Sequence, residues 1–361
     1  MTDDKIILLS AGGTGGHLFP ALALAEELLL SKNKVQLITD TRCQKYINKD
    51  LSFTVNVIDF HLKMNSIFNK IISLYKIIFS CFKHVFLIKK ISPKVIIGFG
   101  GYTSFPAIFA ARILNIPYVL VELNCFLGKA NRLFTDKAHL IALTYKETVN
   151  VGHIHKDKII YTGDLVRSAI RNLPIKDNFN KEAFKIFVFG GSQGAKIFSE
   201  LIPTAIEKIL QNNPNTQIEI TQQAKIEDHD RLNNFYQKLR VKHTISDFFH
   251  NIHEIYADSD LAITRSGSGT VAELVTIGLP SIFIPFPYAM EDHQYYNAKA
   301  LEDSGASWCY RQETLTPEIL ANKILALINN RKLLINASEN MIKRKSNGTK
   351  YLADTVLKII Q

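Results

Sequence analysis

A strand, a glycine-rich turn and a helix follow one another twice in this chain, and no other feature restricts the fold as strongly. The first copy is the apolar run 5–10, the turn Ala-Gly-Gly-Thr-Gly-Gly-His at 11–17, and helix formers up to Leu29. The second copy is the run 185–189, the turn Gly-Gly-Ser-Gln-Gly-Ala at 190–195, and a helical stretch to Leu210. Each copy is typical of the start of a doubly wound parallel sheet. The sequence therefore predicts an α/β protein with two Rossmann-like domains.

Length and composition agree with two globular domains. The chain has 361 residues, of which 47% are apolar; this excludes disordered, collagenous and coiled-coil classes. Pro174 and the polar residues around it predict a linker at 172–180. The tail from residue 317 onward is helical in pattern, with a break at Asn347-Gly348. Further strands are expected at residues 35–39, 94–97, 118–121, 217–221, 261–264 and 281–284.

The glycine turns are typical of phosphate binding, because their backbone N–H groups can approach a phosphate at the positive end of the following helix. A third such turn, Gly-Phe-Gly-Gly-Tyr-Thr-Ser at 98–104, also follows a predicted strand. The first turn lacks the third glycine of the dinucleotide fingerprint, and none of the turns has the lysine of a P-loop. Asp40 ends the second predicted strand, where it would either bind a ribose or cap a turn.

Four side chains near these turns carry candidate chemistry. His17 stands where the first turn enters its helix, and is either a general base or a plain polar residue of the helix start. Glu273 would accept hydrogen bonds from both hydroxyls of a ribose, or else form a capping box with Thr270. Gln294 and Asn297 would either bind sugar hydroxyls or be solvated on a helix surface.

The segment from Phe60 to Val121 has no Asp or Glu but eight Lys or Arg residues. Lysines recur there at six- or seven-residue intervals, with aliphatic and aromatic residues between them. This pattern is typical of an interfacial helix on an anionic membrane; the alternative is a core helix with a solvated lysine edge. Nucleic acid is not the expected partner, because no nucleic-acid motif is present. The predicted membrane patch comprises Lys70, Ile71, Tyr75, Phe79, Phe82 and Lys83.

The net charge of +10 is concentrated in the first half of the chain. Residues 1–165 have 20 basic and 12 acidic side chains, whereas residues 166–361 have 23 and 21, so a polyanionic partner would meet the first half. The four cysteines form no Cys-x-x-Cys pair, which predicts free thiols in a reducing cytosol. No segment has the pattern of a signal peptide or of a spanning helix, so we expect a soluble protein.

Six motifs occur in one order along the chain. They are Ala11–His17, Gly98–Tyr102, Glu122-Leu123-Asn124 with Asn131, Gly190–Ala195, Arg265–Glu273, and Gln294-x-x-Asn297-Ala298. Together they resemble the MurG family of bacterial UDP-N-acetylglucosamine:lipid I N-acetylglucosaminyltransferases. The resemblance extends to about residue 310 and implies the GT-B fold, two Rossmann-like domains facing across a cleft. It implies an acceptor and membrane-side domain at 1–165, joined by a C-terminal helix at about 341–361, and a UDP-sugar domain at 166–340.

The resemblance also implies a reaction and its residues. N-acetylglucosamine passes, with inversion, from UDP-N-acetylglucosamine to the C4 hydroxyl of undecaprenyl-linked lipid I. The product is lipid II for peptidoglycan synthesis, made at the cytoplasmic face of the inner membrane without cofactor or metal. His17 is the candidate base and Glu122 the second candidate. The implied donor contacts are Thr14, Gly15, Gly16, Asn124, Arg167, Ser192, Glu273 and Gln294, with the backbone at Phe249 for the uracil. The implied acceptor-diphosphate residues are Gly13, Gly100, Gly101 and Tyr102.

Two departures from the family pattern and three alternatives accompany this interpretation. Asp164-Leu165 stands where the family usually has Asn-Pro, and Val121 and Leu123 stand where it often has polar residues. A diacylglycerol-type GT-B glycosyltransferase would share the patch and the UDP site but differ in sugar specificity. A UDP-sugar epimerase needs no basic apolar patch. A non-enzymatic, membrane-associated nucleotide sensor would keep Glu273 and lack turnover.

Overall fold

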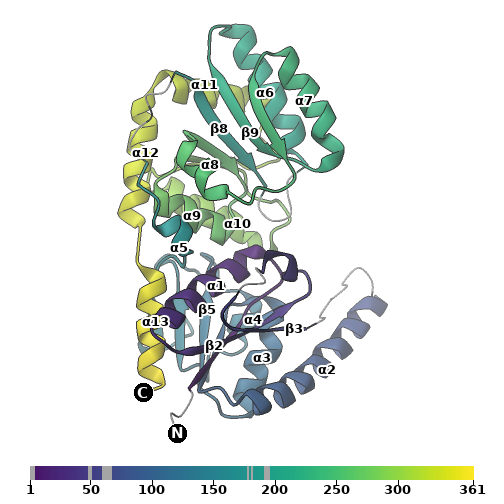
Figure 1. The fold of residues 1–361 in the computed structure, drawn as a ribbon, viewed down its shortest axis with the longest axis vertical. Helices are drawn as coiled ribbons and strands as arrows, with labels where there is room; N and C mark the ends of the chain where they lie inside the picture. Colours follow the sequence, from purple (N-terminus) through teal and green to yellow (C-terminus); the bar gives the residue numbers. More distant parts are fainter. Residues whose placement is uncertain (1–4, 48–50, 59–66, 177–178, 180–181, 191–195) are drawn as a thin grey trace. The chain divides into compact units, whose positions relative to one another are not determined.

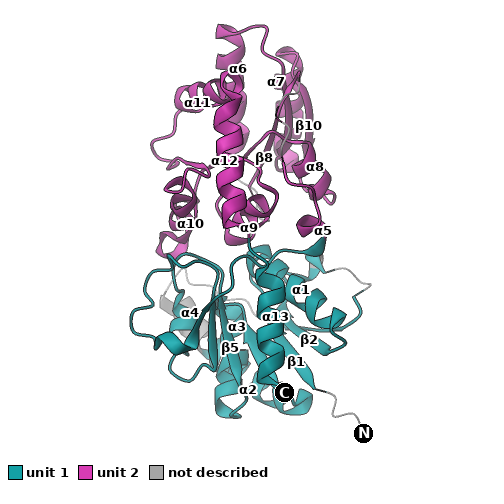
Figure 2. Ribbon diagram, turned by 90° about the vertical axis from the view of Figure 1, so that its left-hand side faces the viewer, with its two compact units in different colours: residues 1–168, 346–361 teal, residues 169–345 magenta. Residues whose placement is uncertain are grey.

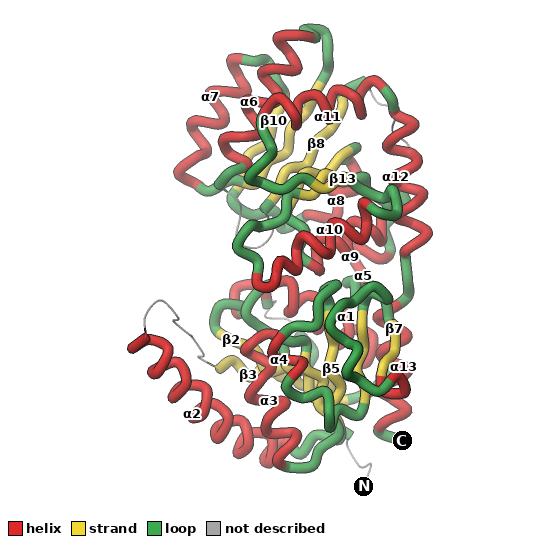
Figure 3. The backbone as a smooth tube through the Cα atoms, turned by 180° about the vertical axis from the view of Figure 1, so that it is seen from behind, coloured by secondary structure: helices red, strands yellow, loops and turns green. Residues whose placement is uncertain are grey.

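The computed structural model describes residues 5–47, 51–58, 67–176, 179, 182–190 and 196–361 (Figure 1). The chain divides into two compact units (Figure 2). Unit 1 comprises Met1–Ser168 and Ser346–Gln361, and unit 2 comprises Ala169–Lys345. Each unit has a parallel sheet flanked by helices (Figure 3), so the predicted α/β class with two doubly wound domains is confirmed.

Unit 1 is built on a seven-stranded parallel sheet with the strand order β3-β2-β1-β4-β5-β6-β7. Its strands are β1 (Ile6–Ser10), β2 (Lys34–Asp40), β3 (Thr54–Ile58), β4 (Val95–Gly98), β5 (Tyr118–Glu122), β6 (Leu140–Leu143) and β7 (Ile159–Tyr161). Its helices are α1 (Gly15–Leu30), α2 (Ile67–Ile91), α3 (Gly101–Ile113), α4 (Lys129–Arg132) and α13 (Gly348–Ile359). A short helix, α5 (Ser168–Arg171), leads into unit 2.

The central strands of unit 1 are apolar on both faces because helices cover both faces of a parallel sheet. Along β1, Ile7 and Leu9 belong to the core beneath α1 and α13, whereas Leu8 belongs to the core beneath α2 and α3. Successive side chains of a strand point to opposite faces, so this short apolar run contributes to two cores at once.

Unit 2 repeats the arrangement with six parallel strands in the order β10-β9-β8-β11-β12-β13. Its strands are β8 (Phe184–Phe189), β9 (Ile218–Gln223), β10 (Lys242–Ser246), β11 (Leu261–Thr264), β12 (Ser281–Phe283) and β13 (Trp308–Cys309). Its helices are α6 (Phe198–Asn212), α7 (His229–Lys238), α8 (Ile252–Asp258), α9 (Ser268–Ile277), α10 (His293–Glu302), α11 (Pro317–Asn329) and α12 (Arg331–Arg344). Short 3-10 helices lie at Gln44–Tyr46, Lys156–Lys158, Ile226–Asp228 and Met290–Asp292.

Both sheets reverse their strand order at one point, between β1 and β4 in unit 1 and between β8 and β11 in unit 2. In open α/β sheets, ligands bind at the carboxyl ends of the strands where this reversal occurs. In unit 1, β1 and β4 are paired side by side, with Ser10 opposite Gly98. The turns that follow these two strands, far apart in sequence, therefore meet at one edge of the sheet.

The break at Asn347-Gly348 separates α12, in unit 2, from α13, which packs against α1 in unit 1 (Figure 2). A Cβ atom on Gly348 would stand 2.6 Å from the carbonyl oxygen of Asp164 and 2.7 Å from that of Thr162. The backbone N–H of Asp164 donates to Ser346 Oγ at 2.8 Å. Asp164, at the point where the sequence departs from the family pattern, therefore packs against the start of α13.

The predicted linker at 172–180 is wrong where the structure describes it. The backbone N–H of Lys176 donates to Ile277 O at 2.9 Å, and Ser338 Oγ donates to Lys176 O at 3.0 Å. Phe179 is buried in the core of unit 2. The proline and the polar side chains signalled a loop correctly, but tertiary contacts hold this loop on unit 2.

The sequence analysis did not predict five of the observed strands, namely β3, β6, β7, β10 and β13. They are short, and β10 consists of residues that are all partly or fully exposed, so no apolar run marks it. Within the basic, apolar segment 60–121, residues 67–91 form the helix α2, which lies alongside α3 (Figures 1 and 3). None of the helices in the described part of the chain is both long enough and apolar enough to cross a bilayer.

Candidate active site

The first and third glycine turns lie together in unit 1. The backbone N–H of Phe99 donates to Ser10 O at 3.0 Å, which joins the ends of β1 and β4. A Cβ atom on Gly101 would stand 3.6 Å from Cε1 of His17, so the imidazole lies against the third turn. Nδ1 of the half-buried His17 is 3.4 Å from Thr14 Oγ1. The structure thus brings the candidate base to both predicted phosphate-binding turns.

The backbone of these turns requires glycine. Gly13, Gly100 and Gly101 have φ values of +86°, +76° and +70°, a region that side chains other than glycine seldom adopt. The turn leads into α1 through Thr14, whose side chain makes no capping hydrogen bond. The first backbone N–H groups of α1, including those of Gly15 and Gly16, point out of the helix start, where an anion is favoured.

Asp40 caps a turn, and its alternative role as a ribose ligand is contradicted. The fully buried carboxylate accepts from the backbone N–H groups of Gly13 at 2.9 Å, Arg42 at 3.1 Å and Cys43 at 3.2 Å. It also forms an ion pair with the Arg42 guanidinium. These partners occupy both oxygens, so Asp40 holds the first glycine turn in place.

Arg42 is a candidate phosphate ligand that the sequence analysis missed. Its guanidinium carbon is 4.8 Å from the centre of the Tyr102 ring, and a Cβ atom on Gly13 would stand 3.2 Å from its Nη2. The cation therefore lies between the two glycine turns of unit 1. Its position two residues after the strand-ending Asp40 was the only signal in the sequence.

Glu122 organises the loop that follows β5. It is buried, and its Oε1 accepts from the backbone and side-chain N–H groups of Asn124, both at 3.1 Å. Its Oε2 accepts from Gly128 N at 2.9 Å and Asn131 Nδ2 at 3.0 Å. Burial raises the pKa of Glu122, and these donors oppose the rise. The geometry favours a positioning role for Glu122, because each of its two carboxylate oxygens already accepts two hydrogen bonds.

Arg167 lies in unit 1, in the loop that precedes α5. Its guanidinium carbon is 4.2 Å from the centre of the Phe19 ring on α1. Nearby, the backbone N–H of Ser168 donates to Glu26 Oε2 at 3.2 Å. The α1 surface therefore holds this predicted donor contact within unit 1.

Glu273 lies inside α9 and not at its capping position, so the alternative capping box with Thr270 is contradicted. The N-cap of α9 is Gly267, three residues before Thr270. The carboxylate of Glu273 is 8% exposed, and its Oε2 accepts a hydrogen bond from the buried Tyr256 hydroxyl at 3.1 Å. The Tyr256 phenol thus helps to orient the acid.

Polar side chains fix the start of α10 against the end of β11. Ser266 Oγ donates to Gln294 O at 2.7 Å, and the buried Asn297 Nδ2 donates to Ser266 O at 3.1 Å. Gln294 Oε1 accepts from Phe286 N at 3.0 Å, which leaves its amide nitrogen as the group it can offer to a sugar hydroxyl. Asn297 is fully buried and holds α10 against the end of β11, so it is neither solvated on a helix surface nor placed to bind a sugar hydroxyl.

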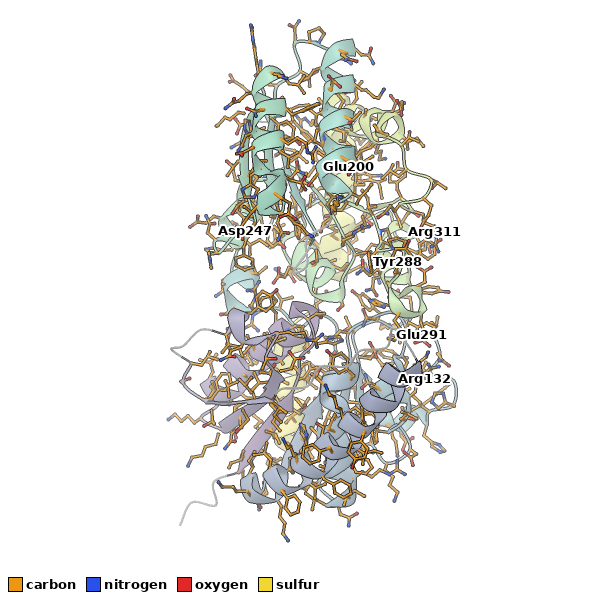
Figure 4. All side chains as sticks on the ribbon, turned by 90° about the vertical axis from the view of Figure 1, so that its right-hand side faces the viewer. Arg132, Glu200, Asp247, Tyr288, Glu291 and Arg311 are labelled. Carbon is orange, nitrogen blue, oxygen red and sulfur yellow. The ribbon has the colours of Figure 1, made fainter. Side chains whose placement is uncertain are left out.

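Arg265 clamps the proline-containing turn after β12. Its Nη1 donates to Ile284 O and Pro285 O, both at 2.9 Å, and its Nη2 donates to Gln312 Oε1 at 2.7 Å. Burial lowers the pKa of Arg265 to about 10. Beyond this turn, Tyr288 and Arg311 lie on the same side of unit 2, away from Asp247 (Figure 4).

Gly190, the described first residue of the second glycine turn, is held by Gln223, a residue without any signal in the sequence analysis. Gln223 Oε1 accepts from Gly190 N at 3.1 Å, and its Nε2 donates to Asp247 O at 3.0 Å. Gln223 thus joins this turn to the turn that carries Phe249, whose ring centre is 5.7 Å from that of Phe187. Ser192 lies outside the described residues.

The exposed face of α2 carries aromatic side chains. Tyr75, Phe79, Phe82 and Phe86 are 76%, 57%, 62% and 73% exposed. Lys83 Nζ is 4.7 Å from the centre of the Phe79 ring. Lys70 and Ile71 belong to α2, but their side chains are outside the described part of the structure. The alternative of a core helix is wrong for this face, because these aromatic residues are exposed and not buried.

Among the described residues, no cluster of His, Cys, Asp or Glu has the arrangement of a metal site. Cys43, Cys81, Cys125 and Cys309 form no disulfide bond.

Comparison with known sequences identifies two domains. Residues 7–143 match the glycosyltransferase family 28 N-terminal domain, and residues 185–356 match the glycosyltransferase family 28 C-terminal domain. A Rickettsia bellii protein is 45% identical over 360 residues, covering 99% of this chain and 100% of that protein. Its name is UDP-N-acetylglucosamine–N-acetylmuramyl-(pentapeptide) pyrophosphoryl-undecaprenol N-acetylglucosamine transferase.

Comparison with solved structures supports the same grouping. MurG of Acinetobacter baumannii superimposes with a TM-score of 0.77 at 28% identity, covering 98% of this chain and 99% of that one. A UDP-N-acetylglucosamine 2-epimerase superimposes with a TM-score of 0.69 at 13% identity, covering 99% and 96%. The second likeness shows the fold alone. With the two parallel sheets, these likenesses confirm the predicted GT-B fold class.

Proposed function

The chain belongs to glycosyltransferase family 28 and, within it, to the MurG family, and from this premise we propose that it forms lipid II. It transfers N-acetylglucosamine from UDP-N-acetylglucosamine to the C4 hydroxyl of N-acetylmuramoyl-pentapeptide-diphospho-undecaprenol. The observation that carries this proposal is the full-length identity of 45% to a transferase of that name. The residue roles proposed below are those that the family resemblance implies, and the geometry within each unit supports several of them.

Unit 2 would bind the donor. Glu273 is nearly buried and oriented by Tyr256, and a carboxylate is a strong acceptor for the two ribose hydroxyls. The uracil would contact the backbone near Phe249, which Gln223 ties to the second glycine turn through Asp247. Gln294 would donate its amide to the sugar, and Ser192 would contact the diphosphate.

Unit 1 would bind the acceptor diphosphate at Gly13, Gly100, Gly101 and Tyr102. Two features support this assignment: these three glycines have no side chain and a positive φ, which lets a ligand approach the backbone of both turns closely, and the Arg42 guanidinium adds charge beside them. Thr14, Gly15 and Gly16 form the start of α1 and would stabilise negative charge on the donor. Asn124 and Arg167 would contact the donor sugar and diphosphate from the same unit.

The reaction would be a single displacement with inversion. The acceptor C4 oxygen bonds to the anomeric carbon as the bond from that carbon to UDP breaks, and the hydroxyl proton passes to His17. His17 is the candidate base because its imidazole is half-buried against the glycine turns, and imidazole groups are common general bases in enzymes. Glu122, the second candidate, would act by holding Asn124 and the loop around it.

The exposed face of α2 would dock on the anionic cytoplasmic surface of the inner membrane, where the acceptor lipid is. Exposed aromatic residues alternate there with Lys76, Lys83, Lys89 and Lys90. On an anionic membrane, apolar side chains of this kind insert into the interface while neighbouring cations meet the lipid headgroups. The protein would then be peripheral, attached through unit 1.

The experiment is to incubate the purified protein with radiolabelled UDP-N-acetylglucosamine and a lipid I analogue, then measure label in the lipid extract. We expect label to move into the lipid only when the analogue is present, and far less with UDP-glucose as donor. Label that stays in a donor which still binds would refute the acceptor assignment. Transfer to diacylglycerol, or release of an epimerised sugar, would replace the proposal by one of the alternatives.

A further inference from the structure

A small polar cavity lies in unit 1, between the end of β2 and the helices α2 and α3. Its volume is about 10 Å³, room for about one water molecule. Three residues of its lining, Thr39, His84 and Thr103, have buried polar atoms, Oγ1, Nε2 and Oγ1, with no hydrogen-bond partner in the described part of the chain. Buried polar atoms are almost always paired with protein or with ordered water. The lining comprises Ile38, Thr39, Asp40, Ile58, His84 and Thr103.

The hydrogen bond of His84 fixes what its free nitrogen can do. Nδ1 is 2.7 Å from the carbonyl oxygen of Ser80, and because a carbonyl only accepts, Nδ1 carries the proton. The side chain is 2% exposed, and burial lowers its pKa, so the ring is neutral near pH 7. Nε2 is then unprotonated, and its lone pair can accept a hydrogen bond from a nearby donor. The Thr103 hydroxyl, or a water between the two, can supply it.

Thr103 lies directly beneath the first glycine turn. A Cβ atom on Gly12 would stand 3.0 Å from Thr103 Cγ2 and 3.1 Å from its Oγ1, so the threonine and the turn are in contact. Asp40, which also lines the cavity, accepts from the backbone N–H of Gly13. Any shift of the groups in the cavity is therefore passed to Gly12 and Gly13.

The other side of α2 is the exposed aromatic face. Ser80, Cys81, His84 and Ile88 are buried, whereas the aromatic residues of the preceding and following turns are exposed. One helix thus presents a docking face to the outside and His84 to the cavity. It is packed along α3, which begins at the third glycine turn.

We propose that one water in this cavity joins His84 to Thr103, and that His84 is a positioning residue linking α2 to the glycine turn that binds the acceptor diphosphate. The inference rests on the proposed function, because it assigns the turn to the acceptor. His84 touches neither substrate. It acts by fixing where the backbone N–H groups of the first turn stand.

The test compares His84→Leu and His84→Gln with the unaltered protein. His84→Leu removes the lone pair at nearly constant volume, and we expect the KM for the lipid I analogue to rise about tenfold while the KM for UDP-N-acetylglucosamine stays within about twofold. His84→Gln keeps an acceptor oxygen near the position of Nε2, and we expect it to restore most of the acceptor KM. Thr103→Val in the His84→Leu background should add little, because both changes break one link.

Ile88→Val is the matched control, since it trims a fully buried side chain of the same helix away from the cavity lining. It should lower the melting temperature without changing the acceptor KM. Hydrogen exchange of the 11–17 segment gives a readout independent of turnover, and it should be faster in His84→Leu but not in Ile88→Val. An unchanged acceptor KM with unchanged exchange, or equal changes in both KM values, would overturn the inference. An unaltered protein that transfers no label would instead refute the proposed function.

Discussion

Replacing Glu273 by glutamine should weaken donor binding through the ribose. Glu273 is 8% exposed and its Oε2 accepts a hydrogen bond from the Tyr256 hydroxyl, so the proposed ribose contact is made by a nearly buried, oriented carboxylate. Glutamine keeps one carbonyl oxygen, replaces the other acceptor by an NH2 group and removes the charge. A hydrogen bond to a charged group contributes about 1.5–3 kcal/mol. At about 1.4 kcal/mol per factor of ten, the donor KM should rise about 10- to 100-fold.

The assay is the donor KM at saturating acceptor, together with UDP affinity by calorimetry. A UDP analogue lacking both ribose hydroxyls separates this role from a general loss of structure. The unaltered protein should bind that analogue more weakly than UDP, and Glu273→Gln should discriminate less between the two nucleotides than the unaltered protein does. Glu254→Gln, an exposed acid on neighbouring α8, is the control. A donor KM that stays constant in Glu273→Gln would refute the ribose assignment.

Three further predictions concern unit 1. His17→Ala should reduce kcat by about 10²- to 10⁴-fold with UDP affinity unchanged, and near-normal turnover would show that another group is the base. Gly348→Ala should lower the free energy of unfolding by about 1–3 kcal/mol, because its Cβ would meet backbone atoms of residues 162–164, whereas Gly152→Ala, with open space around it, should not; equal melting temperatures would contradict the packing argument. Phe79→Ser combined with Phe82→Ser should weaken binding to anionic vesicles at least tenfold in co-sedimentation, since burying each phenylalanine contributes about 1.5–3 kcal/mol. Undiminished sedimentation would mean that another surface meets the membrane.

Local signals in the sequence predicted much of the fold. Apolar runs ending in glycine turns located β1, β4 and β8, because a buried parallel strand is apolar on both faces and its turn requires backbone freedom. The edge strands β3 and β10 were missed since their side chains are partly exposed and carry no such run. At residues 172–180 a local signal was misleading. The composition indicated a linker, but hydrogen bonds of Lys176 with α9 and α12 hold this loop on unit 2.

The candidate site divides in the same way. The sequence by itself was enough to select His17, Glu273 and the glycine turns as candidates, because residue type and turn geometry are local properties. Only the tertiary structure decided which groups meet. The pairing of β1 with β4 brings His17 to Gly101, and Arg42 to Tyr102, across more than fifty residues of sequence. It also decided that Asp40 and Glu122 are held by backbone N–H groups, since hydrogen-bond saturation depends on distant parts of the chain and on loop conformation that no spacing of residues encodes.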